Sequence, residues 1–174
     1  MNRTKFVLGL MTSRMPLSWL ASLLLFAALT ACAARIVDHA FGFNAVQDSP
    51  GVEILDYRYG DSKQPTASNP EHLRKEGRSL QGTSIQGRML RGDFLYVKWR
   101  IRSTGQVYED TVDLRNRLPA DIAHDTVYFI VKGPQLYVYL IKDELRDPDT
   151  PPIGSAVYAP LKAIAIYPTQ PTSK

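Results

Sequence analysis

A two-residue alternation between Phe94 and Leu114 constrains the fold of this chain more than any other feature. Apolar side chains occupy every second position from Leu95 to Ile101, and polar or amphipathic ones fill the positions between them. Successive side chains of a β-strand point to opposite faces, so this period predicts a strand with one buried face. A turn at Thr104-Gly105 would return the chain as a second strand over residues 106–114.

A two-residue loop at Thr104-Gly105 would fix the register of this hairpin, because the turn length sets which residues pair. The predicted inner-face pairs are Ile101 with Tyr108, Val97 with Val112, and Leu95 with Leu114. On the outer face, Arg100 would lie opposite Glu109 and Lys98 diagonal to Asp113, so opposite charges align. The same register places Asp110 inside, opposite Trp99, where the indole N–H is a suitable donor.

A second hairpin is predicted from residues 126–132 (TVYFIVK) and 135–141 (QLYVYLI), with Gly133-Pro134 as its turn. The predicted pairs on one face are Val131 with Leu136, Phe129 with Val138, and Val127 with Leu140. The other face carries Tyr128, Ile130, Tyr137 and Tyr139. Both faces are apolar, which is typical of strands that lie in the middle of a sheet and are covered on both sides.

Further strands are predicted at residues 52–59 and 161–167, with a shorter one at 83–90. Six or seven strands with little helix indicate an all-β fold, a single antiparallel β-sandwich or small barrel. We expect the β-domain to cover residues 51–168, preceded by a tether at 32–50 and followed by a polar tail at 169–174.

Residues 60–82 form one long polar segment, longer than the roughly 12–15 residues usual for loops in compact domains. Asn69-Pro70-Glu71 predicts a short helix with Asn69 as its N-cap, ending at Gly77. On or near this helix lie His72, Arg74 and Lys75, a cationic group suited to an acidic partner. Of the two interpretations of this loop, a solvated excursion is favoured over a partner contact.

The first 31 residues have the plan of a secretory signal. Residues 1–14 carry three basic side chains and no acid, and residues 15–29 are apolar. An apolar stretch of this length is short for a membrane span, which needs roughly 20 residues. We therefore interpret residues 1–31 as a signal peptide.

The segment Leu29-Thr30-Ala31-Cys32 resembles the lipobox of bacterial lipoprotein precursors. The resemblance implies cleavage before Cys32 and lipidation of its sulfur, which would anchor the chain to a membrane. Ala33 after the cysteine implies sorting to the outer membrane, facing the periplasm, with the inner membrane as the alternative. Two other interpretations are an uncleaved signal anchor, and a plain secretory signal that leaves Cys32 as a free thiol. A free exposed thiol is reactive in an oxidising compartment, so lipidation is the preferred interpretation.

The composition of residues 32–174 limits the classes of partner that we expect. Removing residues 1–31 from the 174-residue chain leaves 143 residues, enough for one domain with a core. Three of the 21 Lys and Arg lie in the removed part, so 18 basic residues face 17 acidic ones. This balance gives no reason to expect a nucleic-acid partner. Cys32 is the only cysteine, so we expect no internal disulfide.

Motifs for catalysis, metal binding or phosphate binding are absent from the sequence, and we expect no cofactor and no metal. His124-Asp125 with nearby Asp121 is the closest approach to a metal or acid–base cluster, although such residues more often satisfy turns. One alternative function is a hydrolase that uses Asp110 or Asp113 with His124. Another is a carrier of a small hydrophobic ligand, which would need a cavity between two sheets.

The favoured hypothesis is a non-enzymatic envelope lipoprotein whose β-domain binds another protein. In size and export the chain is similar to small periplasmic lipoproteins that neutralise imported toxins, a likeness of class alone. The expected contact surface combines the long loop with the tyrosine-bearing hairpin. Its residues are His72, Arg74, Lys75, Tyr128, Tyr137 and Tyr139.

Overall fold

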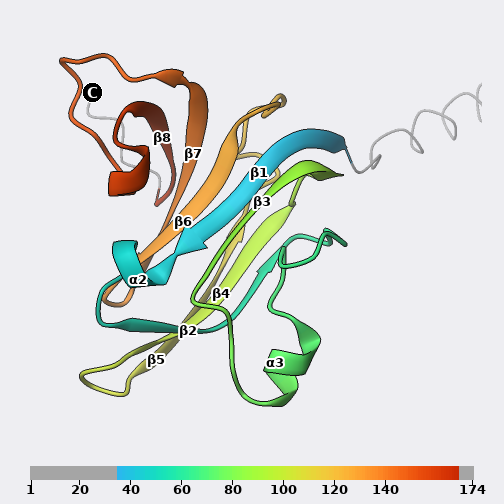
Figure 1. Ribbon diagram of the computed structural model, residues 1–174, viewed down its shortest axis with the longest axis vertical. Coiled ribbons are helices and arrows are strands. Elements are labelled where there is room, and N and C mark those ends of the chain that lie inside the picture. Colours follow the sequence, from blue (N-terminus) through green and yellow to red (C-terminus); the bar gives the residue numbers. More distant parts are fainter. Residues whose placement is uncertain (1–34, 169–174) are drawn as a thin grey trace, which may run out of the picture. The chain divides into compact units, whose positions relative to one another are not determined.

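The computed structural model describes residues 35–168 (Figure 1). The predicted signal peptide, Cys32 and the polar tail lie outside these residues. The strands are β1 (Ile36–Asn44), β2 (Val52–Tyr59), β3 (Gly82–Leu90), β4 (Phe94–Ile101), β5 (Val107–Asp113), β6 (Thr126–Lys132), β7 (Gln135–Leu145) and β8 (Leu161–Tyr167). The helices are α2 (Ala45–Asp48), α3 (Glu71–Lys75) and the 3₁₀ helix η1 (Ala156–Tyr158). Among residues 35–168, no helix is long and apolar enough to cross a membrane.

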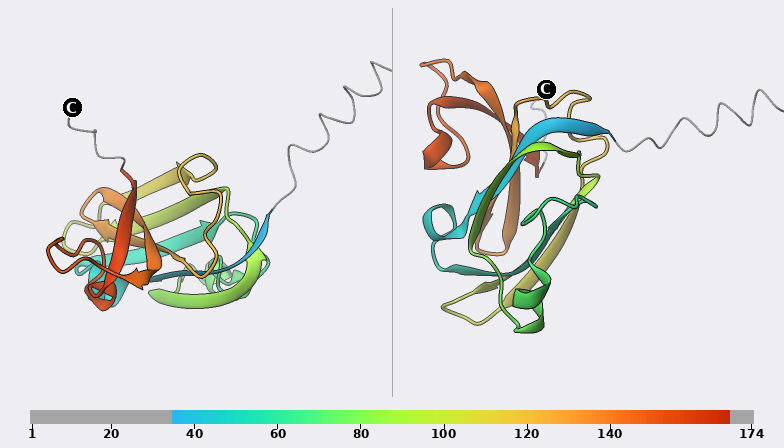
Figure 2. Two further views of the ribbon diagram at one scale, coloured as in Figure 1. Left: turned by 90° about the horizontal axis from the view of Figure 1, so that it is seen from above. Right: turned by 45° about the vertical axis from the view of Figure 1, so that its right-hand side comes forward.

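The strands form two sheets, which Figure 2 shows from two further sides. One sheet has five strands in the order β3-β1-β6-β7-β8, and the other has three in the order β2-β4-β5. The fold is a β-sandwich, as predicted, and not a closed barrel. One neighbouring pair, β1 with β6, is parallel, whereas the other pairs are antiparallel.

Strand β1 lies in the segment 32–50 that we expected to be a tether, so that expectation is corrected for Ile36–Asn44. β1 lies between β3 and β6 in the five-stranded sheet, and its Phe41 and Phe43 are buried. The inward side chains of β1 alternate from Val37, and the second of them is His39, which is fully buried. A histidine at an inward position interrupts the apolar alternation, which explains why the sequence predicts a tether and not a strand here. This strand is also why the structure exceeds the six or seven strands expected.

The β4–β5 hairpin forms with a register two residues away from the predicted one. Trp99 pairs with Tyr108 and Leu95 with Val112. The loop holds four residues instead of two, because Ile101 N–H donates to Gln106 at 2.8 Å. An even shift keeps every side chain on its predicted face, so the alternation alone does not distinguish the two registers.

The shift changes the individual partners in this hairpin. Lys98, and not Arg100, lies opposite Glu109. Asp110 lies opposite Val97, so it does not receive the indole N–H of Trp99. That N–H instead donates to the carbonyl of Gly133 in the β6–β7 turn, at 2.9 Å.

The β6–β7 hairpin has the predicted register. Val131 pairs with Leu136, and Val127 with Leu140. Gly133 in the turn has a φ of 57°, a left-handed conformation that glycine adopts without strain. The turn at Gly133-Pro134 therefore determines the register of the hairpin. Strand β7 continues beyond its predicted end to Leu145.

Aromatic side chains fill the layer between the two sheets. The ring centroids of Phe41 and Tyr59 are 4.6 Å apart, and those of Phe43 and Phe129 are 4.4 Å apart. Phe43 also meets Tyr57 edge to face at 4.8 Å. These contacts occupy the space in which a carrier of a hydrophobic ligand would need its cavity.

Residues 60–82 close the edge of the sandwich between β2 and β3 and are not a free excursion. The carbonyl of buried Ala67 accepts from Tyr59 N–H at 2.9 Å, and Asn69 N–H donates to Tyr57 at 2.9 Å. The side-chain amide of Gln81 bonds both the N–H and the carbonyl of Ile54, at 3.0 and 2.8 Å. The segment therefore satisfies backbone groups at the edge of β2.

Asn69 does not cap α3 as we predicted. Pro70 occupies the N-cap position, and the Asn69 side chain donates to the carbonyl of Arg78 at 2.9 Å. This bond joins the two ends of the segment that contains α3. The need of a buried amide for a partner thus outweighs the local capping preference.

Burial of His39 is expected to make the stability of the domain depend on pH. The Nδ1–H of His39 donates to Val37 O at 3.0 Å, which leaves Nε2 to accept from the Tyr59 hydroxyl at 3.0 Å. Burial lowers the pKa of His39, while the carbonyl of Val37 and the charge of Asp38 oppose this shift and Arg91 adds to it. Between the lowered pKa and the ordinary value of about 6.5, the unfolded chain binds the proton more tightly.

We therefore expect the free energy of unfolding to fall as the pH drops below about 6.5, by at most about 1.4 kcal/mol per pH unit from this group. The stabilisation that neutral, buried His39 contributes is fully present above about pH 6.5. Urea unfolding at several pH values measures the slope, and His39→Gln should reduce it. His72→Gln, on the exposed helix α3, is the matched control. Equal slopes for the His39→Gln protein and the unsubstituted protein would contradict this account.

Candidate functional site

The outer face of the three-stranded sheet carries aromatic side chains among charges. Phe94 and Tyr96 point outward from β4 because they alternate with the buried Leu95 and Val97. In the register of the sheet, Tyr96 lies opposite Arg58 of β2. Aromatic side chains are enriched at protein contact surfaces, and they are also common in ordinary β-strands.

A cavity of about 310 Å³ lies at this face. Residues of β2, β4 and β5 line it, and α3 contributes Arg74. Figure 1 shows α3 beside the three-stranded sheet, at the edge formed by β2. We call this cavity the aromatic groove, defined by Asp56, Tyr57, Arg58, Arg74, Phe94, Tyr96 and Thr111.

Contacts within the domain hold the two arginines of the aromatic groove in place. Arg58 Nε donates to the carbonyl of Gly60 at 3.1 Å, and its guanidinium lies 5.4 Å from the centre of the Phe94 ring. Arg58 also forms an ion pair with Asp61. Side chains that are ordered before binding lose less entropy when a partner arrives.

The second arginine connects α3 to the sheet. Arg74 donates to the carbonyl of Asn69 at 3.0 Å, and its Nε lies 3.9 Å from Asp56 Oδ1. Asp56 in turn accepts from the N–H of Tyr57 at 2.9 Å. Polar contacts therefore join α3, which carries Arg74, to β2, which carries Asp56.

Tyr96 is a neutral hydrogen-bonding group at physiological pH. Its hydroxyl lies 3.1 Å from Glu109 Oε2, to which it donates. Burial raises the pKa of Tyr96 to about 12, and the acceptor Glu109 acts in the same direction. The phenol thus keeps its proton, which suits recognition and does not suit acid–base chemistry near pH 7.

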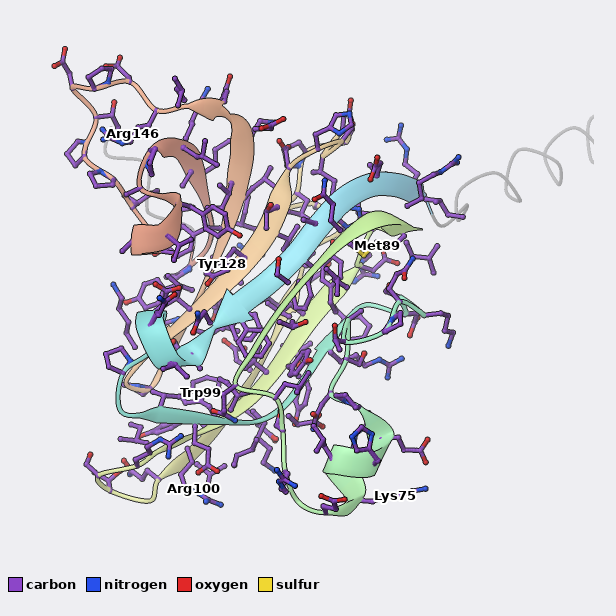
Figure 3. The ribbon with its side chains drawn as sticks, in the orientation of Figure 1. Lys75, Met89, Trp99, Arg100, Tyr128 and Arg146 are labelled. Carbon is purple, nitrogen blue, oxygen red and sulfur yellow. The ribbon has the colours of Figure 1, made fainter. Side chains whose placement is uncertain are left out.

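The six residues predicted to contact a partner do not lie on one surface in the structure. Of the three on α3, Arg74 lines the aromatic groove, whereas His72 and Lys75 are exposed outside its lining. Lys75 pairs with Glu71 at 2.9 Å along the helix. In Figure 3, Lys75 and Tyr128 lie on well-separated parts of the domain, so loop and tyrosines do not form one surface.

The tyrosines of the β6–β7 hairpin belong to a second apolar layer, which the sequence favoured over a contact surface, and their proposed place in the partner contact is corrected. Tyr128 is 4% exposed and Tyr139 is 8% exposed, while Tyr137 is half-buried. The Tyr128 hydroxyl donates to Asp48 at 2.7 Å, and the Tyr158 ring of η1 meets Tyr128 edge to face at 5.1 Å. The segment before β8 thus covers this face of the five-stranded sheet.

The residues of the hydrolase alternative lie on different parts of the fold. Asp113 binds Arg115 at 2.6 Å, and this contact lowers the pKa of Asp113 to about 2. Asp110 interacts with the Tyr167 hydroxyl across the two sheets. His124 lines a separate cavity of about 220 Å³ with residues of the five-stranded sheet. No acid–base pair arises among these three described residues.

The cluster around His124 does not form a metal site. Asp125 is buried and pairs with Lys142 at 2.6 Å, and Asp121 accepts from the N–H of Ala123 at 2.9 Å. Within residues 35–168, no three His, Cys, Asp or Glu side chains are arranged to hold a metal ion.

Sequence reasoning missed Phe94 and Tyr96 as site residues. The signal was present, because both stand at the outward positions of the strand with the clearest alternation. An aromatic residue in such a position is an exception to the rule of polar outer faces. Asp56 joins the lining of the aromatic groove because α3 packs beside β2, and no pattern in the sequence predicts that packing.

Comparisons of the chain with protein-family models, with curated proteins and with solved structures found no significant match.

Proposed function

We propose that this chain is a lipoprotein, anchored through Cys32 to the periplasmic side of the outer membrane, whose β-domain binds another protein without catalysing a reaction. The lipobox-like segment 29–32 supports the anchor. An inhibitor or immunity-type role is one form that such binding takes. The aromatic groove is the proposed contact surface.

The observation that carries the proposal is the pairing of aromatic and arginine side chains in the aromatic groove. Tyrosine and arginine are enriched among the residues that dominate binding energy in protein interfaces. Here Tyr96 and Phe94 provide apolar area, and Arg58 and Arg74 provide directed donors beside them. The ordered contacts of both arginines reduce the entropy lost on binding.

The lining of the aromatic groove favours a protein segment over a small substrate. Its lining combines the carboxylate of Asp56, the two arginines and two aromatic rings. Such a mixture matches a peptide segment that presents apolar and charged side chains side by side. The partner proposed here is therefore a folded protein or an exposed loop of one.

Truncating the aromatic residues should abolish partner capture. We expect the double variant Phe94→Ala with Tyr96→Ala to retain less than about a tenth of a partner that the unsubstituted chain captures from crosslinked envelopes, because losing two anchor residues costs about 2 kcal/mol or more. Quantitative mass spectrometry of the captured material measures this ratio.

The matched control is Val46→Ala with Val157→Ala, two exposed apolar positions outside the aromatic groove, 77% and 56% exposed. Circular dichroism must show that both double variants remain folded. Equal capture by the groove variant and the control would reject the groove as the contact surface. Absence of any specific partner for the unsubstituted chain would reject the binding function itself.

A further inference from the structure

The start of β1 is held close to the proposed lipid anchor. Arg35 is the first described residue and follows Cys32 by three positions. An extended chain advances at most about 3.3–3.6 Å per residue, so this stretch spans roughly 10–11 Å at most. The inference below rests on the proposed lipidation of Cys32: a domain tethered so briefly must keep this end against the membrane surface.

An open cavity of about 260 Å³ lies beside the start of β1. Ile36 of β1 is 60% exposed there, and Leu90 of β3 pairs with it across the sheet. Lys63 and Arg88 are exposed basic residues in the same lining, which holds no acidic side chain among the described residues. We call Arg35, Ile36, Lys63, Arg88 and Leu90 together the anchor-end surface.

Hydrogen bonds fix the shape of the anchor-end surface. Arg91 N–H donates to the carbonyl of Arg35 at 2.9 Å, and the Arg35 guanidinium donates to Ala120 O at 2.7 Å. The Gln64 amide donates to Arg88 O at 3.2 Å, which holds the segment after β2 against β3. Met89, labelled in Figure 3, marks this end of β3.

Three basic side chains gather at this end, and the acidic residues nearest to them are Asp38, Asp61, which pairs with Arg58, and Asp121 beside Ala120. Arg35, Lys63 and Arg88 are all exposed. Asp38 lies opposite Arg88 in the β1–β3 register and offsets part of its charge. Basic residues near a membrane are attracted to anionic lipid headgroups, and exposed aliphatic side chains at the same level favour the interface.

We propose that the anchor-end surface lies on the membrane and binds anionic phospholipid headgroups through Arg35, Lys63 and Arg88, with Ile36 at the interface. Acyl chains and a basic patch are two separate signals for membrane attachment, and together they orient a domain that lipid alone would leave free to rotate. The surface is distinct from the aromatic groove, because the two cavities share no lining residue.

Tryptophan fluorescence on vesicles tests this proposal. The full chain, processed in cells and purified from membranes, carries Ile36→Trp and is reconstituted into phosphatidylcholine vesicles with or without phosphatidylglycerol, both brominated in their acyl chains. We expect the introduced indole to be quenched on the anionic vesicles, and the quenching to be lost in high salt. Trp99, which is 1% exposed, gives the background in the protein without this substitution.

Charge reversal by Lys63→Glu with Arg88→Glu should abolish the quenching on anionic vesicles. The control, Lys75→Glu with Arg78→Glu, reverses two exposed charges on and beside α3 and should leave the quenching unchanged. Quenching that is absent, or equal with and without phosphatidylglycerol, would overturn the proposal. Mass spectrometry of the same samples separates the premises: acylated Cys32 without quenching rejects only the surface, whereas unmodified Cys32 rejects the proposed anchor and the orientation that depends on it.

Discussion

Replacing Trp99 with alanine is expected to lower the free energy of unfolding by about 3–5 kcal/mol. The indole is 1% exposed between the two sheets, where its ring stacks on Tyr108 with centroids 5.9 Å apart. Its N–H donates to Gly133 O at 2.9 Å, so the substitution also leaves that carbonyl without this partner. The side chain thus joins β4 of one sheet to the β6–β7 turn of the other.

Urea unfolding followed by circular dichroism measures the loss, because the signal does not depend on the indole. Trp99→Phe is the informative companion, since it keeps most of the apolar area while it removes the hydrogen bond and a small part of the packed ring. We expect it to cost about 1–2 kcal/mol. An unfolding midpoint for Trp99→Ala equal to that of the unsubstituted protein would contradict the packing described for this hairpin.

Cys32→Ala is expected to remove the lipid anchor entirely. If the sulfur of Cys32 carries the diacylglycerol, the alanine variant has no atom to which it can attach. Each buried methylene contributes about 0.8 kcal/mol to membrane attachment, so loss of two or three chains is a large effect. Growth with an alkyne-bearing fatty acid, followed by detection on the purified protein, measures the modification.

Ala33→Asp provides the matched control for the anchor. The residue after the cysteine is the sorting signal that the lipobox resemblance implies, so this variant should keep the label and move from the outer to the inner membrane. Label on the Cys32→Ala protein, or none on the unsubstituted protein, would show that the segment 29–32 is not a lipobox.

The two hairpins show how far alternation predicts a β-fold. The register of β6–β7 was predicted because Gly133-Pro134 is an unambiguous turn between two apolar runs. The register of β4–β5 was wrong by two residues, because the loop holds four residues and both registers put the same side chains inside. The period of two determines on which face of the sheet each side chain lies, whereas its cross-strand partner depends on the length and geometry of the turn.

The candidate site was less predictable than the fold. Arg74 was singled out as one of several basic residues, but its neighbours in the aromatic groove come from strands far away in the sequence. They meet because several hydrogen bonds, among them Asn69 N–H to the carbonyl of Tyr57 and Tyr59 N–H to that of Ala67, hold the long segment on the edge of β2. The burial of Tyr128 likewise depends on η1, which a sequence pattern does not reveal.

Photo-crosslinking from the position of Tyr96 tests the central claim most directly, since it asks in living cells what touches the aromatic groove. A photoreactive phenylalanine analogue replaces Tyr96 in one strain and Val157, exposed on η1, in another. We predict a discrete crosslinked product with one protein from the Tyr96 position and none from the Val157 position. A product from Val157 and none from Tyr96, with both proteins present at normal levels, would contradict the claim that this groove binds the partner.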